Sequence, residues 1–259
     1  MKIVVCVKYV PDAQAERTFA QDNTTDRAGV DGLLSELDEY AVEEALKLVE
    51  AAEGEVVVLT MGPEQATDAI RKSLQMGAHS GVHVLDDAIA GSDAPATSLV
   101  LARAVEKIGG ADLVLTGMAS TDGTMSVVPA MMAERLGLPQ VTMASELGVE
   151  DGTVTIRRDG DASTETITAR LPALVSVTDQ INEPRYPSFK GIMAAKKKPL
   201  ETWSLADLGV DPGEVGQAAA WTSVESFSAR PPREAGQVVQ DEGEGGARLA
   251  EFLVAKKFV

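Results

Sequence analysis

One segment of the chain has the residue types that bind a phosphate group. It reads Gly-Met-Ala-Ser-Thr-Asp-Gly-Thr-Met-Ser from Gly117 to Ser126 and follows an apolar run typical of a buried strand. Its small residues would let backbone N–H groups approach a phosphate at the start of the next helix. Thr121, Thr124 and Ser126 add hydroxyl groups. From composition alone, an ordinary helix-capping loop fits this segment equally well.

We expect this loop to bind a phosphate group without catalysing a reaction on it. It lacks the lysine of a Walker A motif, and the chain has no G-x-G-x-x-G segment. A second loop, Thr60-Met-Gly-Pro63, places Met61 after another predicted strand, where a flexible apolar side chain could form a wall for a planar base. A plain turn fits that loop as well.

Catalytic constellations are missing. His79 and His83 lie near a predicted strand without a serine or carboxylate motif, which favours structural or surface roles. The single cysteine, Cys6, lies in the middle of the first predicted strand and excludes an internal disulfide or a multi-thiolate metal site. We therefore expect no catalytic residue and no metal ligand, so any redox chemistry must come from a cofactor.

Composition narrows the class of protein. The chain has 259 residues, of which 44% are apolar and only 4% aromatic, which suits parallel strands buried on both faces. A formal net charge of -17 argues against a nucleic-acid partner. The apolar run at 3–10 ends at a proline without a signal-peptide cleavage pattern, and no later run is long enough to cross a bilayer. We expect a cytoplasmic protein.

Strands and helices are expected to alternate along the first 180 residues. Strands are predicted at 2–10, 55–60, 81–85, 112–116, 140–143 and 172–177, and helices at 38–52, 63–76, 94–108 and about 127–136. This order predicts an α/β fold with a mostly parallel sheet flanked by helices, which binds ligands at the carboxyl ends of its strands. Residues 153–158 and 164–169 flank a turn-rich segment and predict an antiparallel hairpin added to the sheet edge.

The last part of the chain has a different character. A polar loop from 182 leads into a short helix and three lysines at 196–198. We expect the nucleotide-binding domain to span 1–200 and residues 201–259 to form an extension with a C-terminal arm. A helix is predicted at 248–257, and its apolar side chains favour packing on another chain. These side chains belong to Leu249, Phe252, Leu253, Val254 and, beyond the helix, Phe258.

Several segments resemble the electron-transfer flavoprotein beta subunit family. Residues 182–198, Asn-Glu-Pro-Arg-Tyr-Pro-Ser-Phe-Lys-Gly-Ile-Met-Ala-Ala-Lys-Lys-Lys, are very similar to the recognition-loop region of that family. The stretch from Arg158 through Glu165 and Ile167 to Pro-Ala-Leu-Val-Ser at 172–176 resembles its signature. The segments Val7-Lys8, 38–45 (Asp-Glu-Tyr-Ala-Val-Glu-Glu-Ala) and Gly62-Pro63 also match, and the resemblance extends from residue 1 to about 200.

The resemblance implies a cofactor arrangement and a set of partners. The fold would be adenine-nucleotide alpha-hydrolase-like, paired with an alpha subunit that holds most of the FAD, while this chain holds a structural AMP. Electrons would come from dehydrogenases such as acyl-CoA dehydrogenases and pass to a quinone oxidoreductase or another acceptor, with membrane contact only through that acceptor. The chain would be an electron-carrier subunit rather than an enzyme.

The resemblance also implies which residues form each site. Phe189 takes the position of the apolar anchor that docks the dehydrogenase, with Tyr186 and Ile192 beside it. Leu37 stands where the family often has an aromatic side chain near the flavin. The residues implied in the nucleotide pocket are Cys6, Ser35, Glu36, Leu37, Asp38, Met61, Gly117, Thr121, Asp122, Gly123, Thr124, Met125, Ser126, Val127 and Val128.

Three other classes of protein make different demands on the sequence. An ATP-dependent ligase-like pyrophosphatase would carry a Ser-Gly-Gly-type loop early in the chain, and residues 7–12 carry none. A stand-alone adenine-nucleotide-binding protein would not need the 182–198 segment or the apolar tail. An electron-bifurcating relative with a second FAD in place of AMP stays open.

Overall fold

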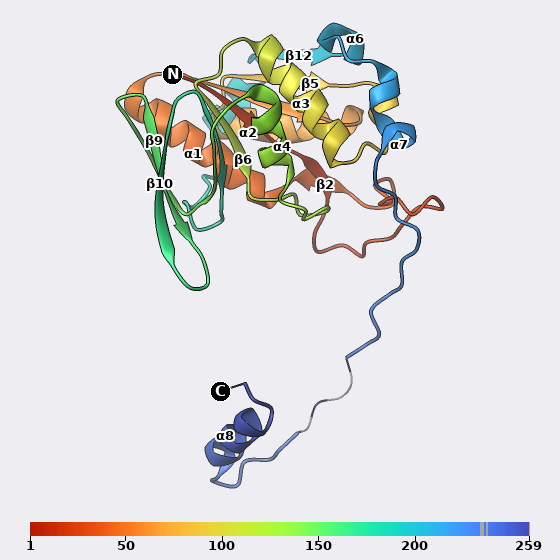
Figure 1. The fold of residues 1–259 in the computed structure, drawn as a ribbon, viewed down its shortest axis with the longest axis vertical. Helices are drawn as coiled ribbons and strands as arrows, with labels where there is room; N and C mark the ends of the chain where they lie inside the picture. The colour runs from red at the N-terminus through yellow and green to blue at the C-terminus, as the bar shows by residue number, and fades with distance from the viewer. Residues whose placement is uncertain (234–235, 237, 259) are drawn as a thin grey trace. The chain divides into compact units, whose positions relative to one another are not determined.

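The computed structural model describes residues 1–233, 236 and 238–258 (Figure 1). The chain divides into two units, Met1–Glu225 and Ser226–Val259. We call the first the compact unit. Each unit is described by itself.

The compact unit is built around a seven-stranded sheet in which every neighbouring pair is parallel. The strand order is β12-β5-β4-β1-β6-β11-β7. The strands are β1 (Lys2–Cys6), β4 (Glu55–Met61), β5 (Ser80–Val84), β6 (Leu113–Gly117), β7 (Gln140–Ala144), β11 (Ala173–Val177) and β12 (Leu200–Trp203).

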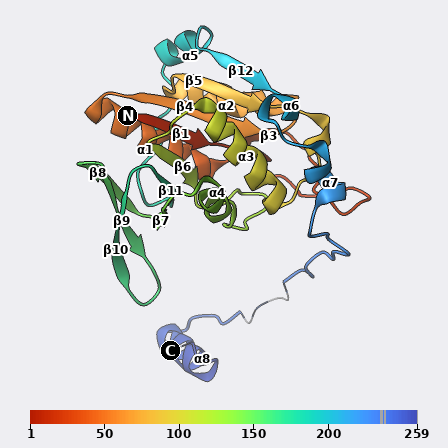
Figure 2. The same cartoon turned by 45° about the horizontal axis from the view of Figure 1, so that its top comes forward.

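Helices cover both faces of this sheet (Figures 1 and 2). The long helices are α1 (Glu36–Ala52), α2 (Thr67–Met76), α3 (Ala94–Ile108) and α4 (Val128–Leu136). Shorter ones are η1 (Glu64–Ala66), η2 (Asp87–Ile89), α5 (Phe189–Ala195), α6 (Leu205–Leu208), η3 (Pro212–Glu214) and α7 (Gly216–Ala219). The α/β class expected from the sequence is confirmed.

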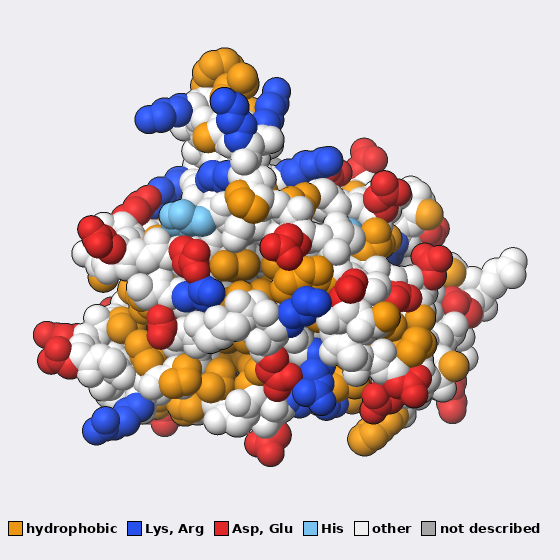
Figure 3. Space-filling view, turned by 90° about the horizontal axis from the view of Figure 1, so that it is seen from above, with side chains coloured by type: hydrophobic (Ala, Val, Ile, Leu, Met, Phe, Trp, Pro, Cys, Tyr) orange, Lys and Arg blue, Asp and Glu red, His pale blue; other side chains and the backbone are white. Residues whose placement is uncertain are grey.

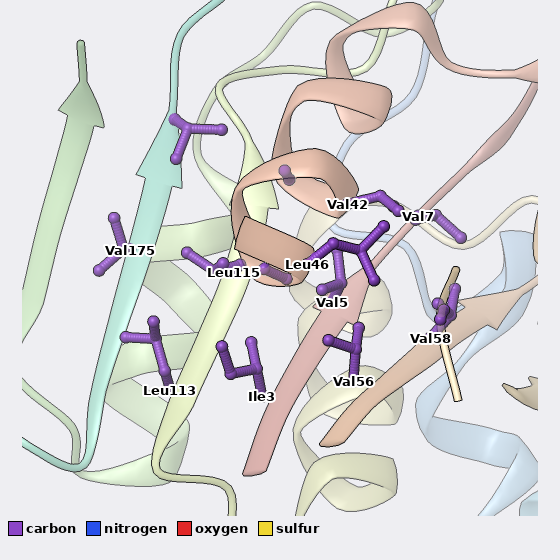
Figure 4. Packing of buried hydrophobic residues seen from close by; sticks show 14 of the residues in the cluster. Ile3, Val5, Val7, Val42, Leu46, Val56, Val58, Leu113, Leu115 and Val175 are labelled. Atoms are coloured by element: carbon purple, nitrogen blue, oxygen red, sulfur yellow. The ribbon is translucent and has the colours of Figure 1, made fainter. Parts of the chain in front are cut away.

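Alternating side chains of the central strands build two hydrophobic cores. Ile3 and Val5 face α1 and α2, whereas Val4 and Cys6 face α3 and α4. The first core packs residues of α1 against four strands, as Figure 4 shows for Val42, Leu46, Ile3, Val5, Val56, Val58, Leu113, Leu115 and Val175. Both faces of the strands are therefore apolar, as parallel strands between helix layers require.

The predicted first strand, 2–10, is wrong in its extent. The sheet strand β1 ends at Cys6, and the chain then turns into β2 (Tyr9–Pro11), which pairs antiparallel with β3 (Gly32–Leu34). The reason is a tertiary hydrogen bond, because the Lys8 N–H donates to the carboxylate of Asp38 at 2.8 Å instead of to a neighbouring strand. Cys6 consequently lies at the carboxyl end of β1 and not in the middle of a strand.

The predicted hairpin forms, but it belongs to a separate sheet. β9 (Thr153–Asp159) and β10 (Thr164–Arg170) pair antiparallel, and β8 (Glu146–Glu150) pairs with the other side of β9. The Ser145 N–H, just after β7, donates to the Arg157 carbonyl oxygen at 2.8 Å, and the Arg158 guanidinium donates to the Thr142 carbonyl oxygen of β7 at 2.8 Å. The hairpin thus lies beside the edge of the main sheet and does not extend its strand order.

Among the described residues of the second unit, one helix forms, α8 (Gly245–Ala255), close to the predicted 248–257. Its apolar residues Leu249, Phe252 and Val254 are exposed, as is Phe258 beyond its end. The packing of residues 201–259 on another subunit stays a prediction. Within the described residues, no helix is long and apolar enough to cross a membrane.

Candidate nucleotide site

The site lies where the strand order reverses. After β1 the chain builds outward through β4 and β5, then returns to place β6 on the other side of β1. The carboxyl ends of β1 and β6 are therefore adjacent, with Cys6 opposite Thr116 in the register. In open parallel sheets this reversal opens a crevice in which ligands bind.

Asp38 joins the two strand ends. Its carboxylate accepts from the Lys8 N–H just beyond β1 and from the Gly117 N–H at the end of β6. The fit is close, because a Cβ on Gly117 would lie 2.6 Å from Asp38 Oδ1 and 2.8 Å from the Leu37 carbonyl oxygen. The start of α1 is thus held directly against the end of β6.

Burial controls the protonation of two groups here. Burial raises the pKa of Asp38 to about 7, although the Lys8 N–H, the Lys8 charge and the Gly117 N–H each act to lower it. Burial, together with the nearby Asp38 carboxylate, raises the pKa of the Cys6 thiol to about 12. Cys6 is therefore a neutral, apolar wall of the site rather than a nucleophile.

The loop after β6 has the backbone shape of an anion cradle. Thr124 and Ser126 adopt positive φ angles of 51° and 58°, a conformation that residues other than glycine rarely take. Alternation of right- and left-handed residues turns successive N–H groups toward one side, where an anion can accept from them. The helix that follows, α4, begins after Val127 without a side-chain cap, so its first N–H groups are also available.

Two buried hydroxyl groups have no hydrogen-bond partner in the described part of the chain. They are Ser35 Oγ and Thr121 Oγ1. Ser35 is completely buried just before α1, and Thr121 lies in the loop after β6. Buried polar atoms are nearly always paired, so both hydroxyls fit a site whose ligand supplies the missing partners.

The loop after β4 is fixed by a buried histidine. His83 Nε2 lies 3.1 Å from the Gly62 carbonyl oxygen and Nδ1 lies 3.2 Å from the Thr67 hydroxyl. Burial lowers the pKa of His83, so the ring is neutral, donates to Gly62 and accepts from Thr67. Met61, predicted from the sequence as a wall for a base, directly precedes Gly62 and is partly buried against the second core. His79 accepts from the Val56 N–H at 3.0 Å and ties the turn after α2 to β4.

Sequence reasoning missed a group of basic residues at this site. Lys8 Nζ lies 2.9 Å from Asp122 Oδ2, Arg27 pairs with the same carboxylate, and Arg17 donates to the Asp122 carbonyl oxygen at 3.4 Å. Burial would raise the pKa of Asp122, but Lys8, the Ser120 hydroxyl and Arg27 together hold it well below its usual range. No local signal reveals the group, because Lys8, Arg17 and Arg27 lie about a hundred residues before Asp122.

The 182–198 segment is held on two helices. The Arg185 guanidinium pairs with Glu43 and Glu50 of α1, and Asn182 donates to the Tyr40 carbonyl oxygen at 3.0 Å. Gly191 lies against Gln75 of α2. A Cβ added to Gly191 would be 2.5 Å from the Gln75 carbonyl oxygen. The segment has little regular structure before α5, so these contacts fix its path.

The side chains expected to dock a partner are exposed on this segment. Tyr186 is 93% exposed, Phe189 80% and Ile192 37%, whereas no residue of α5 is buried. Lysines at 190, 196 and 197 flank them, and Figure 3 shows basic side chains gathered around an apolar tip where Figure 2 places α5. An apolar centre with a charged rim is the usual composition of a protein interface.

The structure brings together part of the predicted nucleotide set. Cys6, Ser35, Asp38 and Gly117 are buried around the ends of β1 and β6, while Glu36 at the start of α1 is exposed. The loop from Gly123 to Ser126 is exposed. Among the described residues no cluster of histidine, cysteine and carboxylate side chains could hold a metal ion.

Comparison with known proteins gives the family. Residues 22–208 match the family described as "Electron transfer flavoprotein domain". The chain is 49% identical, over 99% of both chains, to the electron transfer flavoprotein subunit beta of Mycobacterium tuberculosis. The chain belongs to the electron transfer flavoprotein beta subunit family. It is also 33% identical to the beta subunit of Megasphaera elsdenii, over the full length of both chains.

A further relative of this beta subunit chain has a different description. It is the "Caffeyl-CoA reductase-Etf complex subunit CarD" of Acetobacterium woodii, 37% identical over 99% of this chain and 97% of the relative. The family resemblance found from the 182–198 segment is thus confirmed. Flavin-dependent electron transfer and pairing with an alpha subunit follow from membership, whereas the roles of individual residues stay predictions.

Proposed function

We propose that this chain holds a structural AMP and pairs with an alpha subunit that carries FAD, accepts electrons from dehydrogenases such as acyl-CoA dehydrogenases, and passes them to a quinone oxidoreductase. The observation that carries the docking half of this proposal is the exposure of Phe189 on a segment fixed by Arg185. An exposed apolar side chain on a rigid support can enter a partner's pocket at a lower ordering cost than one on a mobile loop.

The nucleotide half rests on the site between β1 and β6. The unpartnered hydroxyls of Ser35 and Thr121 would accept or donate hydrogen bonds to the sugar and base of AMP. The N–H groups around Thr124 and Ser126 would receive its phosphate. Met61 and Cys6 would supply apolar contacts, since the thiol stays neutral.

The chain itself contributes binding and orientation rather than acid, base or nucleophile. FAD, when bound in the heterodimer, supplies the redox chemistry. The residues of this chain would hold the nucleotide, keep water from the subunit contact and present α5 to the partner protein. Leu37, half-buried beside Asp38, offers an apolar surface where the family often has an aromatic ring.

Counting nucleotides tests the proposal. The chain is co-expressed with its alpha subunit, the purified heterodimer is denatured, and the released nucleotides are identified by chromatography. We expect one FAD and one AMP per heterodimer. Two FAD and no AMP would replace this proposal with an electron-bifurcating relative. A chain that forms no heterodimer and releases no flavin would instead be a stand-alone nucleotide-binding protein.

A further inference from the structure

Three basic side chains converge beside the anion cradle. Lys8 follows β1, and Arg17 and Arg27 come from the long loop between β2 and β3. Lys8 Nζ lies 3.0 Å from Asp122 Oδ1 and 2.9 Å from Oδ2, and Arg27 donates to Oδ2. These contacts join a loop at residues 12–31 to a loop at residues 118–127, so the arrangement exists only in the folded protein.

The partners of this ion-pair group differ sharply in exposure. The Asp122 side chain is 2% exposed, whereas those of Lys8 and Arg27 are each 42% exposed. The carboxylate therefore lies beneath the cations, and one of its oxygens also accepts from the Gly123 N–H at 2.7 Å. The Asp122 carboxylate thus accepts from donors of its own chain, while part of the Lys8 side chain and part of the Arg27 side chain still face solvent.

The group has an excess of positive charge. Lys8, Arg17 and Arg27 carry three positive charges against the single negative charge of Asp122, whose low pKa keeps it ionised. The adjacent Asp38 is buried and its pKa of about 7 leaves it partly neutral. The chain as a whole has a formal net charge of -17, so this local positive excess contrasts with the overall charge and would attract an anion.

Features of the loop next to these cations indicate that the anion is a phosphate group. The buried hydroxyl of Thr121 has no partner and is next to Asp122 in the chain, and the positive φ angles at Thr124 and Ser126 follow within four residues. A tetrahedral phosphate can accept from several N–H and O–H groups as well as from guanidinium and ammonium groups. The same loop thus offers both neutral donors and oriented cations.

We propose that Lys8 and Arg27, with Arg17, form the subsite for the phosphate group of the bound nucleotide, and that Asp122 is a positioning residue that orients these cations from beneath. This inference rests on the proposed nucleotide function and assigns residues that the family resemblance did not. It also changes the role expected for Asp122 from direct contact with the nucleotide to support of the side chains that make that contact.

The test compares AMP with adenosine, which lacks only the phosphate. Nucleotide-depleted heterodimer is titrated with each ligand by isothermal titration calorimetry. We expect Arg27→Gln and Lys8→Met each to weaken AMP binding about 10-fold or more while adenosine binding stays within about 2-fold. Lys8→Met keeps the backbone N–H that donates to Asp38.

The matched control removes the same charge elsewhere. Arg103→Gln alters an exposed residue of α3 that pairs with Glu106, and it should leave the affinity for both ligands unchanged. Equal loss of AMP binding in this control would show a general charge effect and overturn the subsite. So would a parallel loss of AMP and adenosine binding in both site variants, or an unchanged preference for AMP.

Failure of the inference and failure of the proposed function give different results. If the parent protein binds AMP tightly and both variants bind it equally well, the subsite is overturned and the nucleotide function stands. If the parent binds neither AMP nor adenosine, the AMP part of the proposed function is overturned and the subsite with it.

Discussion

The guanidinium of Arg185 forms a two-point ion pair with the carboxylate of Glu43, with Nε 2.7 Å from Oε2 and Nη2 3.0 Å from Oε1. The Glu43 side chain is 8% exposed, whereas that of Glu50, the second partner of Arg185, is 56% exposed. The two glutamates lie two turns apart on α1. One arginine thus fixes the docking segment to that helix through a buried and an exposed carboxylate.

The burial difference predicts unequal effects of the same substitution. Glu43→Gln removes the charge of a buried two-point pair and should lower the stability of the heterodimer by about 1–3 kcal/mol. Glu50→Gln, the matched control, should cost under about 1 kcal/mol because water screens the exposed pair. Chemical denaturation measures both variants, and equal effects would show that burial does not determine the strength of this contact.

Phe189→Ala should weaken docking of the dehydrogenase without changing nucleotide content. Truncation of an exposed anchor at the centre of an interface usually costs at least about 1–2 kcal/mol, or roughly 10-fold in affinity. Electron-transfer rates are measured across dehydrogenase concentrations, and the concentration for half-maximal rate should rise. Leu200→Ala, which truncates another exposed apolar side chain outside α5 and outside residues 201–259, is the control. Identical curves for Phe189→Ala and the parent would contradict the proposal.

Asp38 should make stability depend on pH. Its folded pKa of about 7 lies above the value of about 3.9 in an unfolded chain, so the folded state binds the proton more tightly. The free energy of unfolding should therefore fall as pH rises from about 4 to about 7 and then level off. Asp38→Asn removes this dependence while it keeps a carbonyl acceptor for Lys8.

Thermal unfolding at pH 5 and pH 8 measures this effect. The melting temperature of Asp38→Asn minus that of the parent should be larger at pH 8 than at pH 5. The reason is that at pH 8 the parent has a buried charge at position 38 and the variant has none. Asp68→Asn, at an exposed residue paired with Arg71, serves as the control and should show no such trend. A constant difference between Asp38→Asn and the parent at the two pH values would refute the assignment.

Gly117, at the end of β6, and Gly123, in the loop that follows, should respond differently to alanine. On Gly117 a Cβ would meet Asp38 Oδ1 at 2.6 Å and the Leu37 carbonyl oxygen at 2.8 Å, and backbone cannot move aside cheaply. On Gly123 the nearest atom would be Ser120 Oγ at 3.4 Å, an ordinary contact. Gly117→Ala should therefore reduce the AMP content of the purified heterodimer severalfold, and Gly123→Ala should leave it near the parent value.

Retained AMP in Gly117→Ala would show that the separation of α1 and β6 can change without loss of the site. Loss of AMP in both variants would instead point to a general sensitivity of the loop. Chromatography of the released nucleotides distinguishes these outcomes, with circular dichroism as the check that each variant is folded.

The alternation of apolar runs with helical periods was enough to predict the α/β class, and the 182–198 segment was enough to predict the family. Both depend on short-range patterns, since a strand buried on both faces is apolar at most of its positions and a recognition segment is contiguous. The helix boundaries were close for the same reason: α3 was predicted at 94–108 and is found at Ala94–Ile108.

The end of the first strand could not be predicted in this way. Residues 2–10 are apolar enough for one strand, but Asp38, thirty residues away, takes the Lys8 N–H and turns the chain out of the sheet at Val7. The separate sheet of β8, β9 and β10 was missed for a related reason, because a hairpin pattern does not say which third strand it will pair with.

By itself the sequence determined which segments are buried, which loop has small hydroxyl residues and which segment resembles a docking element, because each property belongs to neighbouring residues. Only the tertiary structure decided that Lys8, Arg17 and Arg27 meet at Asp122 and that Arg185 reaches Glu43. Those contacts join residues about 95 to 142 positions apart. Ion pairs of this kind depend on distance in space, and only the packing of helices on the sheet sets that distance.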